Sequence, residues 1–249
     1  MDVVFIALGV MLIAVIAAVS IALVLAYSAN KKRREAMAAQ GARMGFAYAA
    51  SDPSLMPRFQ ALGDPFNRGF DRQAHNILTG RWNGRPAVSF DYSYKTRSSD
   101  STQIHYLSVV CLHWGLSAPS LSVLPEGAVT RAMGKLVGDD VQLESDEFNR
   151  AFRVTSDNRR FATDVLHART MQFLLAHGRD GFRLLDGQAI RVSRGRIGVL
   201  AIPWALAYLA AILDHIPDHV RRTLGKSPRR WVSGQRTIAR QEPLPATGR

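Results

Sequence analysis

Three titratable side chains in the middle of the chain, Asp91, His105 and His113, are of the types that carry general acid–base chemistry. A carboxylate and an imidazole held within hydrogen-bonding distance can move a proton during hydrolysis. The three residues belong to neighbouring extended segments, so the sequence offers a His–Asp pair across adjacent strands. The competing interpretation is that Asp91 is solvated or caps the loop that follows its segment.

A second group of candidates is the pair His215 and His219, which are four residues apart and have an aspartate directly before each of them. On one continuous helix this spacing places two imidazoles on the same side, as metal ligands require. Pro217 lies between them and interrupts the helix unless it begins a new one. Because no third ligand motif accompanies the pair, a polar helix end facing water is the alternative.

The single cysteine, Cys111, lies in an apolar run, where a thiol usually behaves as a small hydrophobic side chain. One cysteine excludes an intramolecular disulfide framework and a multi-cysteine zinc module. The sequence contains no phosphate loop, no dinucleotide-type glycine pattern and no Gly-x-Ser-x-Gly elbow. We therefore predict no cofactor, and a non-catalytic role is favoured over an enzymatic one.

The elements that position these side chains begin with the clearest β signal in the chain. His75–Trp82, Arg85–Lys95 and Ile104–Trp114 are predicted to form antiparallel strands, and Leu121–Leu124 adds a further short one. In the second strand apolar side chains alternate with polar ones, so that one face carries Val88, Phe90, Tyr92 and Tyr94. This period of two is typical of a sheet with one covered face.

The pattern after Pro125 changes to helices mixed with short strands. Ser145 has the position of a helix cap before two acidic residues, and Ser156-Asp157 has the same position before a longer apolar-periodic segment. The expected elements are a helix over Pro125–Leu136, a strand over Ala151–Thr155, a helix over Asn158–His177 and a hairpin of Phe182–Leu185 with Ala189–Ser193.

Ile197–Leu213 allows three interpretations, because its 17 residues include no charge. A helix of this length spans about 25 Å, which is short for a membrane crossing. A crossing would also export a basic tail against the positive-inside tendency. A helix buried against the sheet is favoured, while an interfacial helix anchored by Trp204 and Tyr208 and a second span are the alternatives.

The amino-terminal segment carries the strongest signal, because no charged residue occurs between Val3 and Asn30. As a helix, the apolar run Val3–Tyr27 spans about 37 Å, enough to cross a hydrocarbon core of about 30 Å. A cleaved signal peptide is the alternative, but the run is longer than a typical signal core and has no basic residue before it. The basic residues after the run predict a cytoplasmic location for everything that follows.

The formal charge of +12 is concentrated in two arms that flank a nearly neutral body. Basic residues beside a span attract anionic lipid headgroups, and an aromatic residue among them favours the membrane boundary. The predicted membrane-surface residues are Lys31, Lys32, Arg33, Arg34, Arg229, Arg230 and Trp231. The tail, Arg221–Arg249, has few core-forming residues and is predicted to be disordered. The sequence contains no module that reads nucleic acid, which disfavours that partner.

The order of these features resembles a family of bacterial, actinomycete-type membrane-tethered proteins of unknown function. The resemblance covers most of residues 30–195 and implies a membrane-attached α+β domain without an assigned catalytic residue. The matching residues are Lys31–Arg34, Asp52-Pro53, Arg58-Phe59, Pro65-Phe66, Asn76–Gly80, Gly84-Arg85-Pro86, Phe90–Tyr94, Glu147-Phe148, Phe152-Arg153-Val154, Asp157, Phe161-Ala162 and Val165-Leu166.

We therefore predict an α+β protein with an amino-terminal transmembrane helix followed by an antiparallel sheet packed with helices. The expected organisation is an anchor over 1–30, a basic juxtamembrane spacer over 31–50, a cytoplasmic domain over 51–220 and a basic disordered tail over 221–249. The predicted function is that of a single-pass membrane protein whose domain binds or scaffolds a protein partner without catalysis. The alternative is a membrane-attached hydrolase or metal-dependent enzyme that uses the histidines and aspartates of the sheet region.

Overall fold

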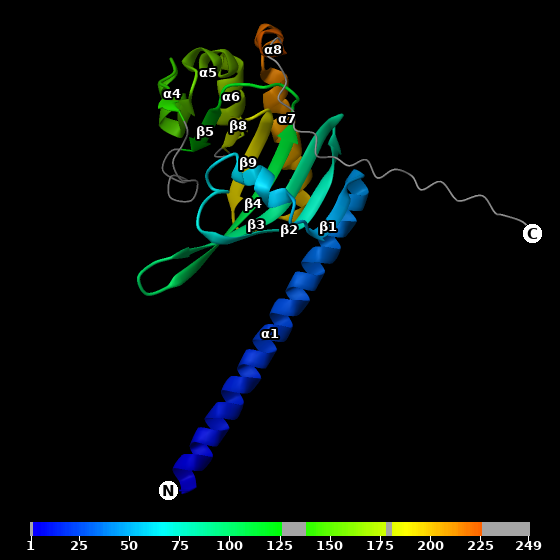
Figure 1. Cartoon of the computed structure of the whole chain (residues 1–249), viewed down its shortest axis with the longest axis vertical. Coiled ribbons are helices and arrows are strands. Elements are labelled where there is room, and N and C mark those ends of the chain that lie inside the picture. Colours follow the sequence, from blue (N-terminus) through cyan, green and yellow to red (C-terminus); the bar gives the residue numbers. More distant parts are fainter. Residues whose placement is uncertain (1, 126–137, 178–180, 226–249) are drawn as a thin grey trace, which may run out of the picture.

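The computed structural model describes residues 2–125, 138–177 and 181–225 of the chain. A helix of 43 residues, α1 (Asp2–Met44), leads into a nine-stranded antiparallel sheet with helices packed on it (Figure 1). The strand order is β1-β2-β3-β4-β9-β8-β5-β7-β6. The predicted class, α+β with an apolar amino-terminal helix before an antiparallel sheet, is confirmed.

The predicted strands of the central sheet are present with small differences at their ends. The strands are β1 (Ala47–Ser51), β2 (Phe70–Trp82), β3 (Arg85–Arg97), β4 (Thr102–His113), β5 (Leu121–Pro125), β6 (Asp139–Asp140), β7 (Phe152–Ser156), β8 (Phe182–Leu185) and β9 (Gln188–Arg194). The predicted hairpin after residue 181 is confirmed as β8 and β9, which are joined by a turn at Asp186-Gly187. Figure 1 shows the end of the β3–β4 hairpin projecting from the domain on the side from which α1 leaves.

The helices that follow α1 are short. They are α2 (Leu55–Gln60), α4 (Asp146–Ala151), α5 (Arg159–Val165), α6 (Ala168–Ala176), the 3-10 turn η1 (Val199–Ala201), α7 (Ile202–His215) and α8 (Asp218–Gly225). Ser145 caps α4, since its side chain accepts a hydrogen bond from the Phe148 N–H, as predicted. The predicted long helix over Asn158–His177 is wrong: Asn158 caps α5, and the chain leaves helical geometry at Leu166 before α6 begins.

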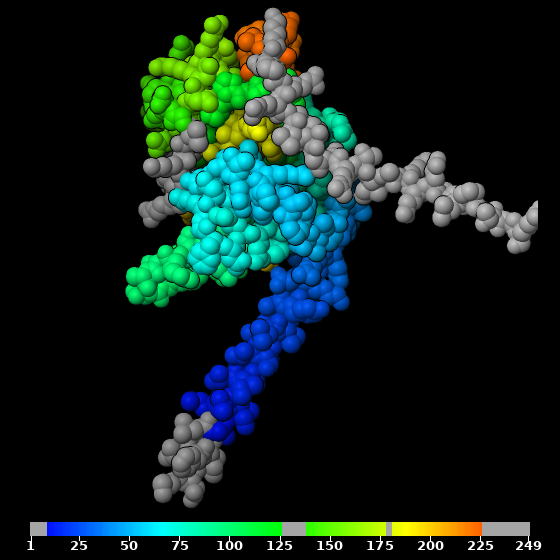
Figure 2. Space-filling view, in the orientation of Figure 1, coloured from blue at the N-terminus to red at the C-terminus, as the bar shows by residue number. Residues whose placement is uncertain are grey.

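Helix α1 continues without interruption past the predicted anchor and into the domain. Its apolar half has exposed side chains, for example Leu23 at 66%, and stands apart from the rest of the protein (Figure 2). Its last turns pack on the sheet, where Met37 is buried and Gly41 lies against β2. A Cβ atom at Gly41 would lie 2.7 Å from Leu78 Cδ2, so glycine permits this close contact. Met37 and Gly41, which lie within the predicted spacer, therefore pack on the domain.

Among the described residues, α1 is the one helix that is by itself long and apolar enough to cross a bilayer, which makes it a candidate membrane anchor. The segments Val199–His215 and Asp218–Gly225 satisfy the same criterion only as a pair, and they are bent by 87° relative to each other. Helix α7 alone has 14 residues and spans about 21 Å. Its length is therefore insufficient for a crossing.

Both faces of the central sheet are covered, whereas the β3 pattern predicted one covered face. Phe90, Tyr92 and Tyr94 point towards α2, where the Phe59 and Phe90 ring centroids are 4.8 Å apart. The opposite face, which includes Ala87, packs against the end of α1 and against α7. The predicted alternation is present, but the second face is also buried, because two helices cover its small and polar side chains.

Helix α7 belongs to this second core. Most of its side chains are buried, and Trp204 is an exposed exception, as is Leu200 in the preceding η1. The buried-helix interpretation of Ile197–Leu213 is therefore confirmed, and an aromatic pair at a membrane surface is not needed to explain it. Tyr208 is buried and stacks on Trp204 with ring centroids 5.5 Å apart.

Replacing a buried leucine of α7 provides a test of this packing. Leu209 is 0% exposed, so Leu209→Ala is expected to lower the free energy of unfolding by about 2–5 kcal/mol through lost contacts and a cavity. The matched control is Leu200→Ala, at a position 76% exposed, where the change is expected to stay within about 0.5 kcal/mol. Urea unfolding of the detergent-solubilised full chain, followed by tryptophan fluorescence, measures both. Equal losses in the two variants would contradict the buried position of α7.

Candidate functional site

An ion pair between α1 and the middle of the sheet is the centre of the candidate site. Arg33 of α1 donates from Nη2 to Asp91 Oδ1 at 2.7 Å and from Nε to Asp91 Oδ2 at 2.8 Å. Both side chains are largely buried, with exposed fractions of 15% for Arg33 and 9% for Asp91. Two parallel hydrogen bonds between ionised groups are the strong form of this interaction. The alternative that Asp91 is solvated or caps a loop is therefore wrong.

Further hydrogen bonds extend the ion pair into a network. The Arg33 guanidinium also donates to the Ile197 carbonyl at 3.1 and 3.2 Å, just before η1. Asn76 Nδ2 donates to Asp91 Oδ2 at 2.8 Å, and the Tyr48 hydroxyl donates to Asn76 Oδ1 at 3.1 Å. The network thus connects α1, β1, β2, β3 and the segment before α7.

Two irregularities in β2 direct its polar side chains towards this network. Its pairing with β3 shifts register between Phe70 and Gln73 and again between His75 and Leu78. Asp71 and Asn76 lie inside these shifts with φ values of 50° and 51°. Asparagine and aspartate tolerate this left-handed backbone better than most residues, and such bulges redirect side chains. The result places Asn76 beside Asp91 inside the protein.

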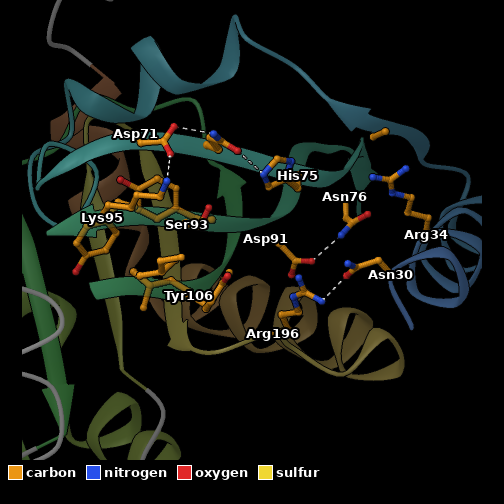
Figure 3. A pocket seen from close by; sticks show the side chains of 16 residues that line it. Asn30, Arg34, Asp71, His75, Asn76, Asp91, Ser93, Lys95, Tyr106 and Arg196 are labelled. Atoms are coloured by element: carbon orange, nitrogen blue, oxygen red, sulfur yellow. Dashed lines mark hydrogen bonds and ion pairs between the residues drawn. The ribbon is translucent and has the colours of Figure 1, made fainter. Parts of the chain in front are cut away.

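A pocket of about 330 Å³ opens beside the ion pair, and we call it the junction pocket (Figure 3). It lies on the sheet face that α1 and α7 cover, between the first turn of α1 beyond its uncharged run and the base of the β3–β4 hairpin. Its lining residues are Asn30, Arg34, Ala50, Asp71, Gln73, His75, Asn76, Asp91, Tyr92, Ser93, Tyr94, Lys95, Ile104, Tyr106, Leu107 and Arg196.

One wall of the junction pocket is a chain of polar side chains from β2 and β3. Lys95 Nζ lies 2.7 Å from Asp71 Oδ2, and Gln73 Nε2 donates to Asp71 Oδ1 at 2.7 Å. The His75 ring Nε2 lies 2.9 Å from Gln73 Oε1. The hydrogen bonds from Lys95 and Gln73 lower the pKa of the Asp71 carboxyl. Asp71 is therefore an anion whose charge Lys95 compensates.

The opposite wall carries two arginines. Arg196 Nη1 donates to Asn30 Oδ1 at 3.0 Å, and its guanidinium lies over the Tyr106 ring, 5.8 Å from the centroid. Arg34 is exposed at the edge of the pocket. Neither arginine forms an ion pair with a described residue, whereas both lining aspartates do. The lining therefore has uncompensated positive charge at Arg34 and Arg196.

The predicted acid–base group is not brought together. His105 lies opposite Tyr94 in the β3–β4 register, on the α2 face of the sheet, while Asp91 is on the other face. The His105 Nε2 atom is 2.7 Å from Thr96 Oγ1, and its ring stacks on Tyr94. His113 ends β4, eight residues from His105, and burial lowers the pKa of its imidazole. No pair among the three has the geometry of a catalytic dyad.

The metal candidates are also separated. His215 ends α7 and His219 lies in α8, beyond the bend at Pro217. Burial is the main cause that lowers the pKa of His215, with a further contribution from the Arg169 charge. Within residues 2–125, 138–177 and 181–225, no group of three histidine, cysteine, aspartate or glutamate side chains is arranged to hold a metal ion.

The remaining candidates divide into three groups. Cys111 is buried, its thiol donates to Gln188 Oε1 at 2.9 Å, and burial raises its pKa. Among the predicted membrane-surface residues, Lys31 and Lys32 are exposed, whereas the Arg33 side chain is largely buried in its ion pair with Asp91. Arg229, Arg230 and Trp231 lie outside the described residues, as do residues 126–136 of the predicted helix over Pro125–Leu136 and residues 226–249 of the predicted disordered tail. Residues 221–225, the start of that tail, are helical instead, as the end of α8.

Sequence reasoning missed the polar residues of β2 and the role of Arg196. Asn76 and Asp71 are of types that strands disfavour, so their presence inside a strand-like segment is a signal for bulges. Arg196 follows Gly195, in a short break between the last strand and the α7 segment. Nothing in the sequence pattern pairs it with Asn30, because 166 residues separate the two.

A double-mutant cycle tests the ion pair. Arg33→Met leaves the Asp91 carboxylate buried without its cation, so it is expected to lower the free energy of unfolding by about 3–5 kcal/mol. Arg33→Met combined with Asp91→Asn should cost less than the sum of the single changes, with a coupling energy of about 2 kcal/mol. Thermal unfolding of the full chain in detergent measures these values. Lys32→Met is the control, and additive effects of Arg33→Met and Asp91→Asn would disprove the pairing.

Comparisons with known proteins are limited to one structural similarity. No protein-family model matches the chain, and no curated protein matches its sequence. Among solved structures, the chain is similar to the crystal structure of the mycobacterial trehalose monomycolate transport factor A, TtfA, with a TM-score of 0.51. The alignment has 14% identity and covers 79% of this chain and 98% of that one. The similarity shows a shared fold, and its mycobacterial source agrees with the actinomycete-type resemblance.

Proposed function

We propose that the protein is a membrane-anchored, non-catalytic accessory factor whose domain binds a protein partner at the cytoplasmic surface of the bilayer. The proposal includes a role in the movement of an amphiphilic molecule across or along the membrane. This second element is based on the fold shared with a protein named as a trehalose monomycolate transport factor. The first element is based on the way in which α1 joins the domain.

The ion pair of Arg33 with Asp91 is the observation that carries the proposal. A flexible linker would let the domain turn freely above the membrane, as linkers without secondary structure do. Here one helix of 43 residues, about 64 Å long, crosses from the apolar segment into the core. Arg33 then joins this helix to β3. The continuous helix and its ion pair hold the domain in one orientation towards the bilayer, which suits a surface that must meet a partner in the same membrane.

The arrangement of the polar residues supports a non-catalytic role over the hydrolase alternative. Asp91, the carboxylate of the predicted acid–base group, is committed to Arg33 and Asn76. Both histidines of the predicted group lie elsewhere. The exposed basic residues Lys31 and Lys32, directly after the uncharged run, support the cytoplasmic orientation through the positive-inside tendency.

Site-directed photocrosslinking in native membranes tests the proposal. A benzoylphenylalanine at Leu200 or Trp204, two exposed apolar positions outside the junction pocket, is expected to form an adduct with one membrane protein. The matched control carries the same crosslinker and a flexible eight-residue glycine–serine insertion between Asn30 and Lys31. This insertion should reduce the yield of the adduct at least fivefold, because the domain loses its fixed orientation.

Two results would contradict the proposal. Absence of any protein adduct from either position would contradict the existence of a protein partner. An adduct that forms equally well with the insertion would show that orientation by α1 has no part in the interaction.

A further inference from the structure

We propose that the junction pocket binds the phosphate-bearing headgroup of an anionic membrane lipid. The inference deepens the proposed function, because it assigns a ligand class to the surface that α1 holds against the bilayer. It depends on α1 being a membrane anchor and is independent of any protein partner.

The position of the pocket along α1 is the first argument. Asn30 and Arg34 are four residues apart, so they lie on the same side of the helix. They follow the last apolar residue of the run, Tyr27, by three and seven residues, or about 4.5 and 10 Å along the helix axis. Headgroup regions add about 5–7 Å to each side of the hydrocarbon core. Asn30 therefore lies at the level of the lipid headgroups, and Arg34 lies a few ångströms beyond them along the helix axis.

The charge of the lining is the second argument. Arg33 compensates Asp91, and Lys95 compensates Asp71, so both carboxylates of the pocket are already paired with cations. Arg34 and Arg196 remain without an ion pair among the described residues. A guanidinium matches the geometry of a phosphate through two parallel hydrogen bonds. Basic pockets beside membrane helices on the cytoplasmic side are suited to phosphate-bearing headgroups.

The neutral groups around the two arginines add recognition without adding charge. The Asn30 side-chain oxygen accepts from Arg196, which leaves the amide NH2 group to donate to a ligand oxygen. Tyr106 holds the Arg196 guanidinium over its ring. Because these contacts hold the Arg196 side chain in place before a ligand arrives, little side-chain freedom remains to be lost on binding.

The shape of the region favours a lipid as the source of the phosphate. Figure 2 shows open space between the β3–β4 hairpin and the apolar half of α1, where both leave the domain. Ile104 and Tyr106 line the pocket from the hairpin side, and each is 50% exposed. They offer apolar contact to the glycerol and the first carbons of the acyl chains. The pocket volume of about 330 Å³ accommodates a headgroup, while the chains remain in the bilayer.

Native mass spectrometry of the detergent-solubilised full chain tests the inference with defined probes. Titration with dioleoyl phosphatidylglycerol is expected to give a complex with one bound lipid, and dioleoyl phosphatidylcholine should bind at least tenfold more weakly. Inorganic phosphate at concentrations up to millimolar is expected not to displace the lipid. Arg34→Gln and Arg196→Gln should each lower the affinity for phosphatidylglycerol about tenfold, as expected for the loss of a charge-assisted hydrogen bond.

The matched control is Lys32→Gln, which removes the same charge two residues before Arg34, from a side chain that does not line the pocket. The affinity of this variant for phosphatidylglycerol should change less than threefold. Thermal unfolding of each variant reports whether the domain remains folded, which is expected because Arg34 is exposed.

Three outcomes would overturn the inference. Equal losses for Lys32→Gln and Arg34→Gln would indicate diffuse electrostatic attraction instead of a pocket. Equal binding of the two lipids would remove the selectivity for an anionic headgroup. Displacement by inorganic phosphate at micromolar concentration would identify a free anion as the ligand. None of these outcomes bears on the photocrosslinked partner, so a failure here is distinguishable from a failure of the proposed function.

Discussion

The rest of the structure depends on the ion pair between Arg33 and Asp91. A carboxylate removed from water in the middle of a sheet is very unfavourable unless a cation and hydrogen bonds compensate its charge. Asp91 receives two hydrogen bonds from Arg33 and one from Asn76. The cation comes from a helix whose other half is apolar and exposed. Folding of the domain and orientation of α1 relative to it are therefore linked by the same contact.

The covering of the sheet explains why a pocket lies beside this contact. Helix α2 packs on one face, and the end of α1 together with α7 packs on the other. On this second face α1 leaves the sheet near Arg33, and the segment leading into α7 begins near Ile197. Strands β3 and β4 continue beyond them towards the tip of their hairpin. Polar side chains such as Asp71 and Lys95 occupy the part of the face that no helix covers. Their mutual pairing leaves the arginines of the opposite wall as the net charge of the pocket.

Much of the fold was predictable from local patterns, because strands and caps are specified by neighbouring residues. The alternation in Arg85–Lys95 predicted which side chains of β3 share a face, and Ser145 predicted the start of α4. The site was harder to predict, because its contacts join distant segments: 58 residues separate Arg33 from Asp91. Four consecutive basic residues after an apolar run resemble membrane-surface charges, and only the tertiary structure shows that one of them enters the core. The break between α5 and α6 was missed because the apolar spacing continues across Leu166.

A distance measurement between α1 and the sheet tests the central claim most directly. With Cys111 replaced by serine, nitroxide labels at Ser20→Cys on α1 and Thr79→Cys on β2 would be placed in the full chain in lipid nanodiscs. A rigid junction predicts a single narrow distribution of label-to-label distances from pulsed electron resonance, which broadens when Arg33 is replaced by methionine. A broad or bimodal distribution with Arg33 and Asp91 both present would contradict the account, because it would place a hinge where the structure has a continuous, ion-paired helix.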